Sequence, residues 1–422
     1  DVIFLTIDTL RADHVGAYGG SSKTPNIDSL AEDGVLFENA WSPISVTGPA
    51  FVSLHTGQHP GTHGVVMNIF RGGNALSDAS ETLAERLKSR GYRNGAFVSG
   101  FTLRRELGLN RGFHRYSTPK HNRRGGDKTA DMALDWLGLQ RGPIFLWYHS
   151  YDPHGPLKRW KGVRTDGDWE KYGANLARIP EYQKLSNISD PAFYAQRYAK
   201  AVEFADRQVG RIIQSLKDTG RYDESIIVFV SDHGESFTER QMWFDHGTTP
   251  YVEQLQVPLI IKYPKGKRAG SRVSADVLLE DVAPTVLDTM RSPKLYNADG
   301  ESLNSDHVTG RQVLWGESSH CKKSKVLLCS PTGPDGKLFA VRDHAMTVIR
   351  EPREDGVHTL VIDRRADPKE LHPSEDAVAP EALLEQLDAM AESRNAMDLA
   401  NPDEAELGEA ETEALRALGY ME

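Results

Sequence analysis

Cysteine is scarce: the 422-residue sequence contains two, Cys321 and Cys329, with seven residues between them. That spacing suits neither a zinc knuckle nor a C-x-x-C redox pair. A disulfide that closes a short loop is favoured if the protein is exported, and two free thiols are the alternative. The sequence therefore excludes a metal or redox centre built from cysteine.

Three other features are missing. Lys and Arg number 50 against 60 Asp and Glu, which gives a net charge of −10 and argues against a nucleic-acid partner. No apolar run approaches the roughly 20 residues of a membrane span. There is no low-complexity segment. The sequence starts at Asp1 without Met, so we expect a trimmed signal peptide and a periplasmic or secreted protein, with a cytoplasmic one as the alternative.

What the sequence does contain is a regular alternation of strands and helices over its first ~290 residues. The segments VIFLTID (2–8), PIFLWYHSYDPHGP (143–156) and SIIVFVSDHGE (225–235) predict buried parallel strands that end in acidic and histidine residues, and amphipathic segments at 80–92, 129–140 and 190–219 predict helices. This pattern predicts an α/β fold with a mainly parallel central sheet flanked by helices.

The pattern changes near residue 310. Short alternating segments, QVLWGE, KLFAVRD and HAMTVIR, predict a small antiparallel sheet, and the acidic segment 367–422 predicts terminal helices. We therefore expect a catalytic α/β domain over 1–310 and a smaller subdomain over 311–422.

Acidic and imidazole side chains follow the predicted strands. Asp8 ends the first, Asp232 and His233 end the run at 225–231, and His246 lies in the polar loop after it. Active sites of open α/β sheets lie at the carboxyl ends of the strands. Carboxylates with an imidazole suit a divalent cation: Zn²⁺, Mn²⁺, Ca²⁺ or Mg²⁺.

The segment SVTGPAFVSLHTG (45–57) brings a hydroxyl to a predicted helix. Pro49 fits a first helical turn, which places Thr47 just ahead of the helix N-terminus, where negative charge is favoured. A metal ion next to that hydroxyl would make it a nucleophile. The alternative is a plain N-cap threonine.

The chain resembles the sulfatase-like branch of the alkaline phosphatase superfamily, which includes sulfatases, phosphonate monoester hydrolases and phosphodiesterase-like enzymes. The matching blocks run in order through the chain: IDTLRADHVGAYG, TPNIDSLAEDGVLFENAW, PAFVSLHTGQHPGTHGV, ETLAERLKSRGY, DPHGP, SDHGE, HGTTPYVEQLQVPLII and EDVAPTVLD. The resemblance implies an alkaline-phosphatase-like fold and a metal site formed by Asp8, Asp232, His233 and the nucleophile Thr47. It further implies substrate contacts by His154, His246 and Asn68.

Three departures shift the expected substrate from sulfate towards phosphate. Thr47 stands where sulfatases carry the Cys or Ser that is converted to formylglycine, and Phe51 replaces the arginine of that motif. Thr9 occupies the place of a second Asp. His246 replaces the family's lysine. We therefore expect a hydrolase of phosphate mono- or diesters or phosphonates that forms a phospho-enzyme on Thr47.

Alternatives stay open. The first is a sulfuric ester hydrolase that does not use formylglycine. The second is an inactive relative that binds a glycan or a lipid headgroup. A second metal ion held by Asp152 with His154 and His246 is a further alternative, although Asp-x-His is not the Asp-x₃-His spacing of the two-zinc relatives. His149, inside its strand, is interpreted as a core histidine.

Overall fold

The computed structural model describes residues 1–68, 75–120, 122–157, 160, 183, 191–237, 239, 244–308, 310–311, 313–318, 336–353 and 355–396. Cys321, Cys329, residues 397–422 of the acidic C-terminal segment and most of residues 157–189, which match no family block, lie outside these residues. Among the described helices, none combines the length and apolar character that a membrane span requires.

The main sheet has eight strands in the order β4-β3-β5-β1-β6-β7-β2-β8. β7 runs antiparallel to both neighbours and the other pairs are parallel. This arrangement confirms the predicted α/β class with a mostly parallel sheet. The strands are β1 (Val2–Ile7), β2 (Val35–Trp41), β3 (Arg93–Val98), β4 (Arg115–Ser117), β5 (Ile144–Ser150), β6 (Ile226–Val230), β7 (Gln256–Lys262) and β8 (Ser271–Leu278).

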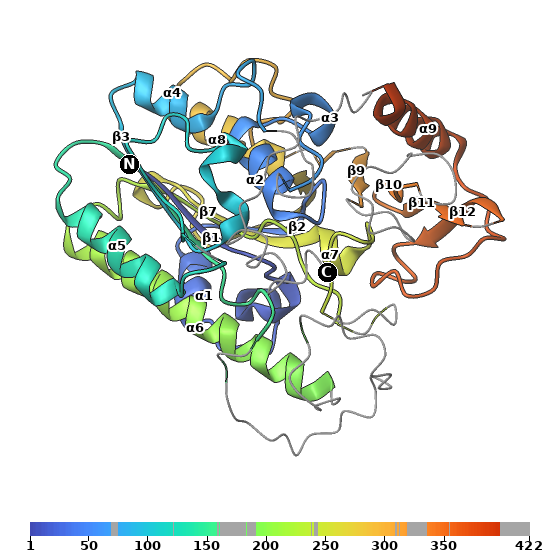
Figure 1. Cartoon of the computed structure of the whole chain (residues 1–422), viewed down its shortest axis with the longest axis horizontal. Helices are drawn as coiled ribbons and strands as arrows, with labels where there is room; N and C mark the ends of the chain where they lie inside the picture. The colour runs from blue at the N-terminus through green and yellow to red at the C-terminus, as the bar shows by residue number, and fades with distance from the viewer. Residues whose placement is uncertain are drawn as a thin grey trace.

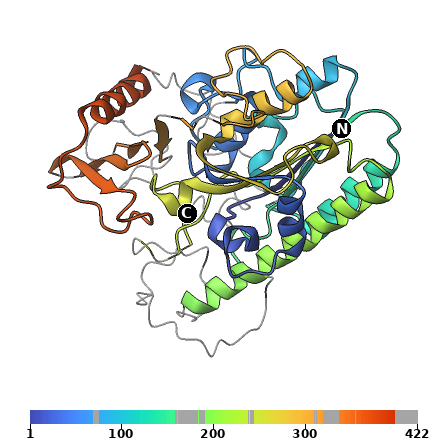
Figure 2. The ribbon, with the colours of Figure 1, turned by 180° about the vertical axis from the view of Figure 1, so that it is seen from behind.

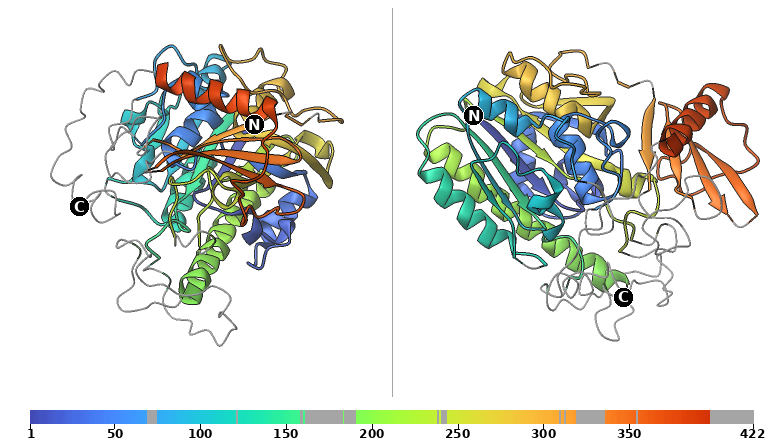
Figure 3. Two further views of the ribbon diagram at one scale, coloured as in Figure 1. Left: turned by 90° about the vertical axis from the view of Figure 1, so that its right-hand side faces the viewer. Right: turned by 45° about the horizontal axis from the view of Figure 1, so that its top comes forward.

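Helices cover both faces of this sheet (Figures 1 and 3), which is why its central strands are mainly apolar. Successive side chains of β1 point to opposite faces: Val2 and Phe4 join one core, and Ile3 and Leu5 join the other. The first core includes α2 (Thr47–Thr56), α4 (Leu83–Ser89) and α8 (Val282–Thr289). The second includes α1 (Pro25–Glu32), α5 (Gly126–Gly138) and α6 (Pro191–Asp218).

A second sheet of four antiparallel strands lies to one side of the main sheet, as Figure 2 shows from behind. Its order is β12-β11-β10-β9, and the antiparallel pairing predicted from sequence is confirmed. The helix α9 (Glu381–Ala396) packs on one face through an apolar cluster with β10 and β11. The strands are β9 (Leu314–Glu317), β10 (Phe339–Arg342), β11 (Met346–Arg353) and β12 (Gly356–Asp363); the last was not predicted.

Two local predictions near the nucleophile segment were wrong. Thr47 is the first residue of α2 rather than the residue ahead of it, and Val46 takes the N-cap position. The sequence also predicts a loop over HPGTHGVVMN (59–68), but this segment contains the short helix α3 (Pro60–His63). Its N-cap is His59, whose ring accepts a hydrogen bond from the Gly61 backbone N–H.

Candidate active site

Two neighbouring parallel strands bring the acidic residues together. Asp8 follows β1, and Asp232 and His233 follow β6, which pairs directly with β1. One ligand atom from each of the three side chains lies within 4.8 Å of the others, and all three are at most 1% exposed. This is the group among the described residues that can hold a divalent metal ion.

The backbone between Asp8 and Arg11 is fixed by the residues that follow β6. The Thr9 N–H donates to Asp232 Oδ1 (3.1 Å), and the Leu10 N–H donates to Ser231 Oγ (2.9 Å). Thr9 has a φ of 54°, which is unusual for a β-branched residue and is held by these contacts. The turn after β1 is therefore shaped around Asp232.

The two carboxylates are incompletely paired. Asp8 Oδ1 and Asp232 Oδ2 are buried and have no hydrogen-bond partner among the described residues. Burial, and then the negative charges of Asp232 and Glu235, raise the pKa of Asp8 well above its usual value, although the nearby Thr47 hydroxyl acts in the opposite direction. Two unpaired buried carboxylate oxygens fit a divalent cation, which would offset their charge.

Thr47 lies at the same place. Its Oγ1 is 3.5 Å from His233 Nε2, and it opens the ten-residue helix α2, whose N-terminus favours negative charge. The Gly48 N–H donates to Asn68 Oδ1 (2.8 Å), and a Cβ at position 48 would lie 2.7 Å from that oxygen. Glycine therefore allows Asn68 to approach the helix end, and this contact leaves the Asn68 NH₂ group as its donor.

The ring of His233 is oriented for ligation. Its Nδ1 is 2.9 Å from the Gly234 carbonyl oxygen, so Nδ1 carries the proton and Nε2 keeps a lone pair. Burial lowers the pKa of His233, which favours this neutral form. Nε2 is also the atom nearest Thr47 and lies 3.4 Å from Asp232 Oδ2.

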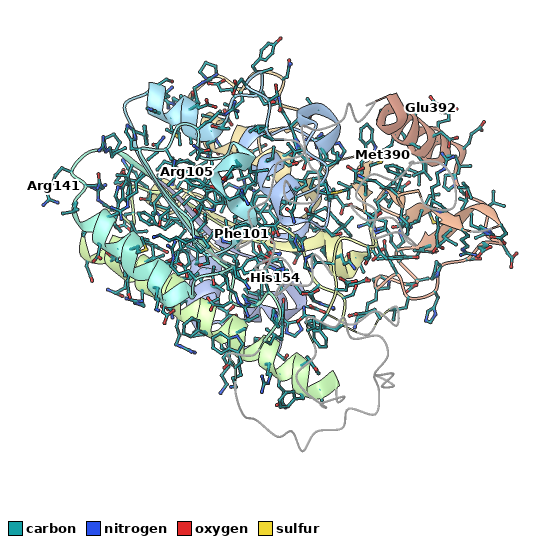
Figure 4. The ribbon with its side chains drawn as sticks, in the orientation of Figure 1. Phe101, Arg105, Arg141, His154, Met390 and Glu392 are labelled. Atoms are coloured by element: carbon teal, nitrogen blue, oxygen red, sulfur yellow. The ribbon has the colours of Figure 1, made fainter. Side chains whose placement is uncertain are left out.

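His154 and His246 form a second layer at the site. His246 packs against the rings of His233 and His154, with centroids 4.6 and 5.0 Å apart. His154 stacks on Tyr151 and donates from Nδ1 to the Gly155 carbonyl oxygen (2.7 Å). Figure 4 shows His154 near the middle of the molecule, away from the C-terminal sheet, where Met390 and Glu392 mark α9.

These two histidines differ in their electrostatic surroundings. Burial, and then the positive charge that His246 can carry, lower the pKa of His154 well below its usual value. His246 instead has Nδ1 3.2 Å from Glu235 Oε1. Burial raises the pKa of Glu235 to about 8, so this pair can share a proton near neutral pH.

The second-metal alternative has no geometric support. Asp152 Oδ2 accepts hydrogen bonds from the Gly126 N–H (3.0 Å) and Ser150 Oγ (2.7 Å), so Asp152 caps the start of α5. It does not join a group with metal-ligand geometry among the described residues. The Gly126 N–H binds this carboxylate, and the position of Asp152 at the end of a strand does not predict that contact.

Two residues that contact the site, Glu235 and His149, were not predicted from the sequence as site residues. Glu235 is the last residue of the SDHGE block, and its place just after Asp232 and His233 could have indicated that it lies at the site. His149 is fully buried, as expected for a core histidine, yet its Nε2 lies 3.3 Å from Asp8 Oδ2. Phe51 packs its ring against His149 and Trp147. Trp147 is fully buried and belongs to the hydrophobic core.

Arg11 and His14, in the turn after β1, have partners within the protein. Arg11 forms ion pairs with Asp13 (2.7 Å) and Glu239 (2.6 Å). His14 packs edge-on against Tyr198 and Phe237, and burial lowers its pKa to about 4. Both residues therefore support the turn after β1.

Comparison with known families fits this geometry. A family model described as Sulfatase matches residues 1–292, more than half of the chain. The chain belongs to the sulfatase family. It is accordingly a hydrolase of ester bonds, and the resemblance seen in the sequence is confirmed. The role of Thr47 as nucleophile stays a prediction.

Relatives of this sulfatase-family chain carry names of two kinds. An N-acetylglucosamine-6-O-sulfatase of Bacteroides thetaiotaomicron is 24% identical over 381 residues, which is 68% of this chain and 67% of the relative. The phosphonate monoester hydrolase of Agrobacterium radiobacter superposes with a TM-score of 0.73 at 22% identity, over 94% of this chain and 96% of the other. A protein solved with its substrate D-glucosamine-2-N,6-O-disulfate gives a TM-score of 0.69 at 19% identity, over 96% and 99%.

Proposed function

We propose that this sulfatase-family chain is a metal-dependent hydrolase of phosphate mono- or diesters or of phosphonates, with Thr47 as its nucleophile. The observation that carries this proposal is the contact of the Thr47 hydroxyl with His233, beside the unpaired oxygens of Asp8 and Asp232. Threonine cannot become formylglycine, because its Cβ bears a methyl group. Attack on a phosphorus ester requires only a hydroxyl group at position 47.

The proposed metal site consists of Asp8, Asp232 and His233 with the Thr47 oxygen. A divalent ion bound there would lower the pKa of the Thr47 hydroxyl and offset negative charge on the ester. The N-terminal end of α2 favours the same negative charge, and the NH₂ group of Asn68 is placed to donate to an oxygen of the transferred group.

The reaction then has two steps. The Thr47 hydroxyl gives up its proton and Oγ1 bonds to phosphorus while the ester P–O bond breaks, and the leaving oxygen takes up a proton, so the number of protons is unchanged. Water then attacks phosphorus, the bond to Thr47 breaks, and the hydroxyl regains its proton. General acid catalysis of the first step is worth roughly 10²–10⁴ in rate.

His246 is the better candidate for the general acid. Its Nδ1 contacts Glu235, so the two groups together can hold a proton and supply it to the leaving oxygen. The lowered pKa of His154 keeps that ring neutral, and its Nδ1–H is occupied by the Gly155 carbonyl oxygen. We expect His246→Gln to slow esters with poor leaving groups far more than p-nitrophenyl esters, because p-nitrophenolate needs little protonation.

Sulfuric ester hydrolysis is the second candidate. It is supported by the sulfatase names of the relatives and by the sulfated glucosamine bound in one structural neighbour. The substrate would then be a sulfated glycan, and Thr47 would attack sulfur in place of phosphorus.

The test uses EDTA-treated protein supplied with Mn²⁺, Zn²⁺, Ca²⁺ or Mg²⁺. The substrates are p-nitrophenyl phosphate, bis-p-nitrophenyl phosphate, p-nitrophenyl phenylphosphonate and p-nitrophenyl sulfate. We expect turnover of phosphorus substrates, loss of at least about 10³-fold in Thr47→Ala, and partial activity in the matched control Thr47→Ser. Turnover of the sulfate alone would favour the second candidate, and full activity in Thr47→Ala would remove Thr47 from the mechanism.

A further inference from the structure

His149 contacts the proposed metal site without belonging to its ligand group. It lies on β5, the neighbour of β1, and its Nε2 is 3.3 Å from Asp8 Oδ2. Both side chains are fully buried. The two oxygens of the Asp8 carboxylate therefore differ. Oδ2 lies next to His149 Nε2, and Oδ1 has no hydrogen-bond partner among the described residues.

The tautomer of His149 follows from its other ring nitrogen. The Ser99 backbone N–H points at His149 Nδ1 (3.3 Å), so Nδ1 must accept and Nε2 must carry the proton. A protonated Nε2 cannot ligate a metal ion, but it can donate to Asp8. His233 is held in the opposite tautomer by the Gly234 carbonyl oxygen, which leaves its Nε2 free to ligate.

Aromatic packing holds the His149 ring in this position. The Phe51 ring lies edge-on to it, with centroids 5.1 Å apart and an interplanar angle of 82°. Trp147 contacts both rings. Phe51 therefore gives His149 an apolar, uncharged wall at the position where the family resemblance implied an arginine.

We propose that His149 is a positioning residue for the metal site: its Nε2–H holds Asp8 Oδ2, so that Oδ1 is turned towards the cation. The inference rests on the metal site of the proposed function. Partners of this kind fix ligand orientation, and their loss typically weakens metal affinity 10–100-fold. A purely structural histidine would contribute to folding stability and leave the affinity unchanged.

The experiment measures Mn²⁺ binding to EDTA-stripped protein by calorimetry, together with thermal unfolding of the metal-free protein. The variants are His149→Leu, which removes the donor, and His149→Gln, whose amide can place a donor near the former Nε2. We expect His149→Leu to weaken Mn²⁺ binding about 10–100-fold and His149→Gln to recover most of the affinity. An unchanged Kd in His149→Leu, with a lowered melting temperature, would overturn the inference.

Two controls show whether a negative result contradicts the metal site itself or only the role of His149. Wild-type protein should bind Mn²⁺ and Asp8→Asn should not. Failure of both to bind would overturn the metal site and the positioning role with it, whereas normal wild-type binding with an unaltered His149→Leu overturns the positioning role alone. If His149→Leu does not fold, His149→Asn replaces it, because its shorter amide matches Nδ1 rather than Nε2. Equal Kd values for the Asn and Gln variants would then contradict the proposal.

Discussion

Two buried carboxylate sites in this chain have opposite hydrogen bonding. Glu370 joins the C-terminal sheet to the main part of the molecule. It accepts from Arg342 Nε (3.0 Å) and Nη2 (3.1 Å), from Thr347 Oγ1 (2.6 Å) and from the Val252 N–H (2.9 Å). Asp8 and Asp232 are equally buried but keep one oxygen each without a partner among the described residues.

The pKa values follow this difference. Burial acts to raise the pKa of Glu370, but the charge of Arg342 and the hydrogen bonds outweigh it and lower the pKa. At Asp8 burial and neighbouring negative charge raise the pKa. The partners of a fully paired buried carboxylate offset the cost of its burial, whereas an incompletely paired one costs stability unless a cation binds. In this chain the contrast sets Glu370, which links two parts of the fold, apart from Asp8 and Asp232 of the proposed metal site.

The largest expected effect is on activity at the incompletely paired site. Asp232→Asn keeps the shape of the side chain but removes a charge that a cation requires. We expect turnover of the phosphorus substrates to fall by at least about 10³-fold, while urea unfolding of the metal-free variant shows stability equal to wild type or higher. Glu370→Gln is the matched control and should keep activity in its folded fraction. Substantial turnover by Asp232→Asn would break the contrast.

Next in size is the stability cost at the fully paired site. Glu370→Gln leaves Arg342, which is 1% exposed and also donates to the Pro250 carbonyl oxygen, without a counter-charge. Breaking one partner of a buried ion pair costs about 3–5 kcal/mol. Urea unfolding should show a loss of this size in Glu370→Gln. A change under about 1 kcal/mol would mean that the pairing adds little to stability.

Cation binding should stabilise the folded protein by offsetting the buried negative charge of Asp8 and Asp232. A divalent ion at 100 times its Kd stabilises the folded protein by about 2.7 kcal/mol. We expect added Mn²⁺ to raise the melting temperature of wild type and Glu370→Gln alike, and to leave Asp8→Asn unchanged. Equal shifts in all three proteins would place the ion elsewhere.

A smaller effect concerns His55, a buried histidine whose pKa is lowered by burial alone. His55 is 1% exposed and packs against Trp147, and burial lowers its pKa to about 3. The unfolded chain takes up this proton near pH 6.5, so stability is lost as pH falls from about 6.5 towards 3. At pH 5 the loss is about 2 kcal/mol. His55→Phe should reduce the difference in unfolding free energy between pH 7 and pH 5 by that amount. An unaltered difference in His55→Phe would show that His55 does not contribute.

Much of the fold could be predicted because apolar periodicity marks buried strands. The runs that become β1 and β6 are apolar throughout, and each is followed by an acid, so parallel pairing necessarily brings Asp8 and Asp232 to one edge. The reversal of β7 could not be predicted, since an apolar run has the same pattern in either direction.

The finer contacts of the site depend on tertiary packing. Asp152 follows a strand just as Asp8 does, yet a helix N-terminus from another segment binds it. The contact of His149 with Asp8 depends on which strand lies beside β1, and the sequence does not state strand order. The pairing of Glu235 with His246 likewise requires the loop after β6 to fold back.

The most direct measurement is a crystal of the protein soaked in Mn²⁺ and examined by anomalous diffraction. We predict one strong peak about 2.2 Å from oxygens of Asp8 and Asp232 and from His233 Nε2, with Thr47 Oγ1 beside it. A map with no peak at these atoms, or with the ion bound away from the Thr47 hydroxyl, would contradict the proposed chemistry.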